Sequence, residues 1–136
     1  MIRHQRATRA VFAFAATLAI LSTLADRGVA QTLTVETGEH ENFTRLVIRL
    51  GADRTWQFER SGRTWRMSVT PSIDRYNLAR SFDVIPRIRV SDLAQDGDTL
   101  LIDLACDCPV SAFRYLDEFL VIDVFDPGTP VADALA

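Results

Sequence analysis

Apolar residues recur at every second position over long stretches of this chain. Between residues 44 and 50, for example, Leu46, Ile48 and Leu50 fall on alternate positions, with Arg49 between the last two. Successive side chains of a β-strand point to opposite faces of the sheet, so this alternation predicts strands that place one face on a core. We therefore expect an all-β protein.

The alternating pattern occurs twice. The strand at residues 44–50 returns at residues 99–105, and aligning Ile48 with Ile102 places Leu50 on Leu104 and Asp53 on Asp107. One extra residue is then placed in the second copy after Asp107. The positions that then correspond are Phe58 with Phe113, Trp65 with Leu120, Met67 with Ile122, Val69 with Val124, and the closing prolines Pro71 and Pro127. The chain is thus predicted to use one short β-motif in two similar halves.

The first thirty residues have the composition of a secretory signal peptide. A basic segment precedes an apolar run and a group of small residues, namely Arg3, Arg6 and Arg9, then residues 10–24, then residues 28–30. The apolar run is too short for a comfortable membrane span. We predict that residues 1–30 are cleaved on export and that the mature chain, starting at Gln31, has no stable membrane span. An uncleaved anchor is the alternative.

Residues 31–126 are expected to form one domain, because a chain of this length can bury a core unaided. We predict strands at residues 32–37, 44–50, 55–60, 63–70, 99–105, 110–115 and 119–125, a short edge strand at residues 85–90, and one helical turn at residues 76–80. Residues 127–136 show no strand pattern and are predicted to be a flexible tail or the start of a linker.

Charge is unevenly distributed along the mature chain. Residues 36–89 hold ten arginines and seven acids, whereas residues 90–136 hold one arginine and ten acids. Such asymmetry orients a protein toward an anionic partner or pairs the two halves internally. No basic cluster is interleaved with stacking aromatic residues, so nucleic acid is not an expected partner.

Cys106 and Cys108 are the one candidate for covalent chemistry. An oxidising compartment outside the cytoplasm favours a disulfide between them. Residues i and i+2 of a flat strand stand about 6.6–6.8 Å apart, at the limit of disulfide reach, so the bond requires a bend, for which Pro109 is suited. Free thiols, metal ligation and redox catalysis are the alternatives.

Nothing else in the sequence favours an enzyme. The chain contains no glycine-rich phosphate loop, no nucleophile elbow and no histidine cluster with metal-ligand spacing. Its aspartates alternate along strands, as expected of a polar sheet face. We therefore predict a non-catalytic protein without cofactor or metal.

Several motifs together resemble the AMIN domain. They are the strand Arg-Leu-Val-Ile-Arg-Leu at residues 45–50, the Trp-x-Phe hairpin at residues 56–58, the connector Ile-Pro-Arg-Ile at residues 85–88, and the closing strand Phe-Leu-Val-Ile-Asp-Val at residues 119–124. The resemblance spans about residues 32 to 125, and the cysteine pair is outside the general pattern. It implies a small β-sandwich in the bacterial periplasm that targets a protein to peptidoglycan or the division site.

Four arginines of the first half are candidate ligand-binding residues. Arg45, Arg49 and Arg66 are predicted on outward strand positions, with Arg63 beside them. Peptidoglycan presents peptide carboxylates, which arginine binds with two parallel hydrogen bonds. The alternatives are a solvated face or pairing with acids of the second half. A second functional hypothesis is docking of another envelope protein at an exposed sheet edge.

Overall fold

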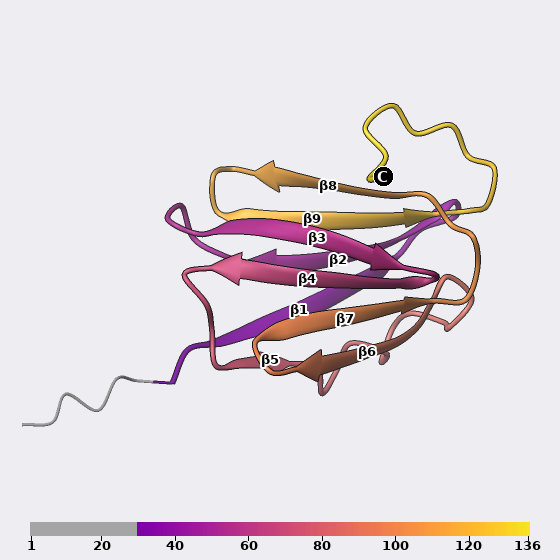
Figure 1. Cartoon of the computed structure of the whole chain (residues 1–136). Coiled ribbons are helices and arrows are strands. Elements are labelled where there is room, and N and C mark those ends of the chain that lie inside the picture. Colours follow the sequence, from indigo (N-terminus) through magenta and orange to yellow (C-terminus); the bar gives the residue numbers. More distant parts are fainter. Residues whose placement is uncertain (1–29) are drawn as a thin grey trace, which may run out of the picture.

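Two β-sheets pack face to face in this protein (Figure 1). The structure, a computed structural model, describes residues 30–136. Its strands are β1 (Thr32–Glu39), β2 (Phe43–Arg49), β3 (Thr55–Ser61), β4 (Thr64–Thr70), β5 (Arg75–Asn77), β6 (Val90–Asp96), β7 (Thr99–Leu104), β8 (Val110–Tyr115) and β9 (Phe119–Phe125). The five-stranded sheet has the order β5-β1-β2-β9-β8 and the four-stranded sheet the order β3-β4-β7-β6. The prediction of an all-β sandwich is confirmed.

The signal peptide predicted over residues 1–30 lies outside the described residues, except for Ala30. Across residues 30–136 we find no helix with the length and apolar character needed to span a membrane.

The two halves exchange strands between the sheets. β1 and β2 lie in the five-stranded sheet but β3 and β4 in the other, whereas β6 and β7 lie in the four-stranded sheet and β8 and β9 in the first. Ile48 of β2 lies opposite Leu120 of β9, and Ile102 of β7 lies opposite Trp65 of β4. Under the predicted alignment Ile48 corresponds to Ile102 and Leu120 corresponds to Trp65, so the two pairs are equivalent. The repeat is therefore present in the strand register.

The extra residue of the second half lies elsewhere than predicted. Phe58 is opposite Met67, whereas Ile122, the counterpart of Met67, is opposite Ala112 rather than Phe113. The match of Phe58 with Phe113 is therefore wrong by one position. The additional residue lies in the turn between β8 and β9, where Leu116 and Asp117 have positive φ angles of 50° and 52°. A single-residue shift moves a side chain to the other face of a sheet.

Alternate residues from both sheets fill the core. The fully buried members include Leu46 and Ile48 of β2, Met67 of β4, Leu100 of β7 and Ile122 of β9. Each such side chain contributes about 1.5–3 kcal/mol through burial of apolar surface. Because all four of these strands are central in their sheets, the core depends on both halves.

The connector between the halves differs from the prediction in two places. Residues 76–80 were expected to form a helical turn, but Tyr76 lies within β5, which pairs in parallel with β1. The Tyr76 side chain is buried, and its backbone N–H donates to Oε1 of Gln95 at 2.8 Å. Pairing with β1 and burial of the ring thus override the local helical preference.

The edge strand predicted at residues 85–90 is also wrong. β6 begins only at Val90 and continues to Asp96. Ile85 is buried whereas Ile88 is 62% exposed, so the apolar residues of this segment do not share one face. β6 pairs with β7 as β1 pairs with β2, which extends the repeat to a fourth strand in each half.

A buried arginine joins the connector to the end of β1 and to the residue after β9. The side chain of Arg89 is 5% exposed. Its Nε donates to Oδ1 of Asp126 at 2.7 Å, its Nη1 to Glu39, and its Nη2 to the carbonyl of Glu41 at 2.8 Å. The hydrogen bond to Asp126, above all, raises the pKa of Arg89 despite its burial. The guanidinium therefore fastens the end of β1 and the residue after β9 to the start of β6.

Replacing Arg89 with lysine is expected to destabilise the fold, because an ammonium group cannot reach all three partners in the planar arrangement of a guanidinium. We expect Arg89→Lys to lower the free energy of unfolding by about 1–3 kcal/mol. Urea denaturation of both proteins measures this difference. The control is Arg80→Lys, because Arg80 is 90% exposed and pairs only with Asp83; its change should stay within about 0.5 kcal/mol. Equal effects of the two replacements would contradict the role given to Arg89.

Candidate functional site

The outer face of the five-stranded sheet carries exposed aromatic side chains. Phe113 and Tyr115 of β8 are 41% and 54% exposed. Phe119 of the neighbouring strand β9 lies on the same face, together with Val121 and with Val47 of β2. Contiguous exposed apolar surface on a protein often marks an interaction site. This face, from β1 to β8, is called the outer face below.

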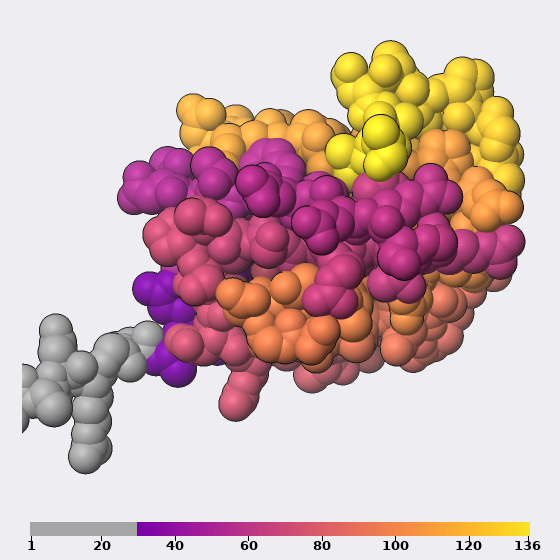
Figure 2. Space-filling view, in the orientation of Figure 1, coloured from indigo at the N-terminus to yellow at the C-terminus, as the bar shows by residue number. Residues whose placement is uncertain are grey.

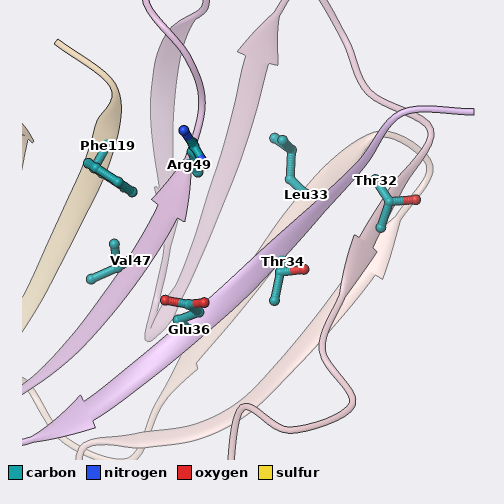
Figure 3. A pocket seen from close by; sticks show the side chains of 7 residues that line it. All are labelled: Thr32, Leu33, Thr34, Glu36, Val47, Arg49 and Phe119. Carbon is teal, nitrogen blue, oxygen red and sulfur yellow. The ribbon is translucent and has the colours of Figure 1, made fainter.

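Two shallow hollows on the outer face share Val47 and Phe119. The first is lined by Thr32, Leu33, Thr34, Glu36, Val47, Arg49 and Phe119. The second is lined by Arg45, Val47, Phe113, Tyr115, Phe119 and Val121. Figure 3 shows the first hollow, where Phe119 of β9, Val47 and Arg49 of β2, and Glu36 of β1 stand on adjacent strands. The hollows therefore form one continuous strip with polar and apolar sections. Its aromatic residues, Phe113, Tyr115 and Phe119, are called the aromatic strip below.

Arg45 lies on the outer face but is already engaged. Its Nε and Nη2 donate to the two carboxylate oxygens of Asp123 at 2.7 and 2.8 Å. The hydrogen bond to Asp123 raises the pKa of Arg45 despite partial burial. The guanidinium also lies 5.2 Å from the ring centroid of Phe43 and 5.9 Å from that of Phe113. Arg45 is thus a fixed cation beside the aromatic strip.

Arg49 is the more accessible of the two outer-face arginines. Its side chain is 73% exposed, and it pairs with Glu118, which follows β8 in the turn. Its guanidinium lies 5.9 Å from the ring centroid of Phe119. An exposed ion pair of this kind contributes at most about 1 kcal/mol, so an incoming anion can compete for the guanidinium.

Arg63 and Arg66 do not belong to this face. Arg66 is on β4 and Arg63 immediately precedes it, so both belong to the four-stranded sheet. Arg63 pairs with Asp107 at 3.1 Å, and Arg66 pairs with Asp96 at the same distance. The hydrogen bond from Arg63 lowers the pKa of Asp107. The four predicted arginines are therefore split between two sheets, and each pairs with an acid of the second half, which was the alternative stated above.

Phe113, Tyr115 and Phe119 were not among the residues predicted to bind a ligand. The predicted match of Phe113 with Phe58, which packs against the core, is wrong by one position, so it gave no indication that Phe113 is exposed. The signal that distinguishes them is the phase of β8, where Val110 is buried and Phe113 is exposed. In the first half, by contrast, Trp56 and Phe58 pack against the core and Trp65 is 3% exposed.

Cys106 and Cys108 lie in the segment that crosses from β7 of one sheet to β8 of the other. Their sulfur atoms are within bonding distance, and their Cα atoms are 5.1 Å apart. This separation is shorter than in a flat strand and lies in the range of disulfides, so the predicted bend is present. Cys108 is buried. Among residues 30–136 no group of three or more metal-ligating side chains is assembled.

The close cysteine pair leads to a prediction about the protein purified without reductant. We expect intact mass spectrometry of this protein to show a mass about 2 Da below that of the dithiol, because a disulfide lacks two hydrogens. Iodoacetamide should add no label until a reductant is present. Labelling of both thiols without reductant would contradict the disulfide and favour free cysteines.

Comparison of the chain with models of protein families, with curated protein sequences and with solved structures finds no match.

Proposed function

We propose that this chain is a non-catalytic module of the cell envelope that binds peptidoglycan on its outer face. The observation that carries the proposal is the exposure of Phe113 and Tyr115 on the same sheet face as Arg49. The site combines aromatic surface with an accessible cation, and the two hollows along it are shallow and open. Such a surface suits an extended polymer better than a small molecule, which proteins bind in concave pockets.

The chemistry of peptidoglycan matches these groups. Its sugar rings have apolar faces that pack on aromatic side chains, and tyrosine adds a polar tip to such a contact. Its peptide stems carry carboxylates, which form paired hydrogen bonds with a guanidinium. Arg49 would take this role by exchanging Glu118 for a stem carboxylate, while Arg45 keeps its bond to Asp123 and holds the cationic edge in place.

The proposal changes the set of ligand-binding residues expected from the sequence. Arg45 and Arg49 remain in it, and Phe113, Tyr115 and Phe119 join them. Arg63 and Arg66 are left out, since they lie on the four-stranded sheet and face away from the aromatic strip.

The proposed compartment is the periplasm. The signal peptide predicted over residues 1–30 and the close pair of cysteines both favour an oxidising compartment outside the cytoplasm. The resemblance to the AMIN domain supports the same location and a targeting role at the cell wall.

Sedimentation with purified sacculi tests the proposed function. We expect the chain of residues 31–136 to pellet with sacculi, less so at moderate salt, because the contact is partly ionic. The double variant Arg49→Ser, Tyr115→Ser should bind roughly tenfold more weakly, a loss of about 1.4 kcal/mol.

The matched control is Arg66→Ser, which removes one exposed, ion-paired arginine from the opposite sheet. It should pellet like the unchanged protein. An unchanged protein that stays in the supernatant at low salt, or an equal loss in the control, would refute the proposal.

A further inference from the structure

β8 is the last strand of the five-stranded sheet, and one of its edges pairs with no other strand of residues 30–136. The N–H of Phe125 donates to the carbonyl of Pro109 at 2.9 Å, which sets the phase of the β8–β9 ladder. In an antiparallel pair, alternate residues bond to the neighbouring strand and the residues between them point their backbone groups the other way. The N–H and C=O groups of Val110, Ala112 and Arg114 therefore point to the free edge.

One of these groups is already used by the C-terminal segment. The N–H of Leu135 donates to the carbonyl of Val110 at 2.8 Å, and the Leu135 side chain packs against the core. Figure 2 shows the C-terminal segment and β8 along the same side of the molecule. The contact resembles the first step of strand addition, and it leaves the backbone groups of Ala112 and Arg114 available.

Beyond the Leu135 contact, the edge of β8 at Ala112 and Arg114 has no bulge and no outward charge that would oppose pairing. Native edge strands are short, bulged or charged. Accordingly, β5 has three residues, β6 has an irregularity between Val90 and Asp92, and β3 carries the exposed residues Glu59 and Arg60. The outward side chains of β8 are Ser111, Phe113 and Tyr115, without a charge.

Arg114 is the one charged residue of β8, and it is turned away from this edge. Its Nη1 donates to the carbonyl of Gly51 at 3.0 Å, its Nη2 donates to the carbonyl of Arg54, and its guanidinium lies 5.0 Å from the ring centroid of Trp56. These contacts hold the charge between the sheets, where it does not repel an incoming strand.

We propose that β8 pairs with β8 of a second copy of this chain, antiparallel, about a two-fold axis at Phe113. Ala112 of each copy then exchanges both backbone hydrogen bonds with Arg114 of the other. Phe113 lies directly opposite the second copy's Phe113 in a non-hydrogen-bonded pair, with Cα atoms about 4.5 Å apart. Facing aromatic residues are a favourable cross-strand pair, and an identical strand is self-complementary about a two-fold axis.

This register accommodates the C-terminal segment. Tyr115 of the second copy lies opposite Ser111, and the strand then turns away at Leu116 and Asp117, whose φ angles are positive. It ends before it reaches the carbonyl of Val110, which Leu135 occupies. The Leu135 contact thus limits the pairing to the part of β8 that the proposed register uses.

The dimer would join the two five-stranded sheets and bring both outer faces to one side. Each copy contributes its own aromatic strip and its own Arg49, so a polymeric ligand can contact both copies at once. Linked sites of this kind bind a polymer more tightly than either site alone. The pairing itself needs no ligand, and its test is therefore independent of the proposed function.

Cross-linking through single cysteines tests the register. In Phe113→Cys the Cα atoms of the two new cysteines would be about 4.5 Å apart, within the 4.4–6.8 Å range of Cα separations in disulfides. Mild oxidation should therefore give a covalent dimer. In Ser111→Cys the two thiols are about 13–14 Å apart at the rise of a β-strand and should not cross-link. Val84→Cys, at an exposed loop position, reports random collision. The proposal would be overturned if Phe113→Cys cross-linked no more than Val84→Cys. It would also be overturned if Ser111→Cys cross-linked more than Val84→Cys.

Sedimentation equilibrium of residues 31–136, which include every strand that the structure describes and the core between the sheets, tests association without chemical modification. We expect the average mass to rise from that of one chain toward twice that value between about 10 µM and 1 mM, a weak affinity suited to a small interface. Phe113→Lys places like charges opposite each other and should remain monomeric, whereas Val84→Lys should behave as the unchanged chain. A monomer throughout, or a Phe113→Lys protein that still dimerises, would overturn the proposal.

Discussion

The pairing of β2 with β9 and of β4 with β7 is the interaction on which the rest of the structure depends. Each ladder joins a strand of the first half to a strand of the second, and each lies at the centre of its sheet. Leu46, Ile48 and Ile122 project from one ladder and Met67 and Leu100 from the other into a common core. Neither half can bury its apolar residues alone, because its own hairpins are in different sheets. The same exchange explains the uneven charge, since arginines of the first half lie beside acids of the second, as Arg45 lies beside Asp123.

The composition of the outer face follows from this arrangement, because side chains alternate between the two faces of a strand. Once the alternate residues of β2 and β9 point inward, Val47, Arg49 and Phe119 must point outward. The extra residue in the turn after β8 then decides which side chains of that strand join them. It turns Phe113 and Tyr115 outward and places Arg114 between the sheets, where the first half has Arg60 at the corresponding position. A one-residue difference between otherwise similar halves thus makes one face of the sandwich aromatic.

Most of the fold could be predicted from local sequence patterns. Alternation identified seven of the nine strands of residues 30–136 to within a residue or two at most ends, and the repeat of Ile48 at Ile102 anticipated the register. The features that were not anticipated depend on distant partners. Tyr76 becomes part of a strand because β1 lies beside it, and Arg89 is buried because Glu39 and Asp126 converge on it from 50 and 37 residues away. The prediction that four arginines form one binding surface failed for the same reason. Whether arginines share a face depends on which sheet each hairpin joins.

We propose that the outer face of the five-stranded sheet binds the cell wall. This surface can be mapped by titrating isotope-labelled residues 31–136 with a soluble disaccharide-peptide fragment of peptidoglycan and following the amide chemical shifts. We expect shifts concentrated at Arg49, Phe113, Tyr115 and Phe119, with little change along β3 and β4. Shifts centred on Arg63 and Arg66, or none at millimolar fragment, would contradict it.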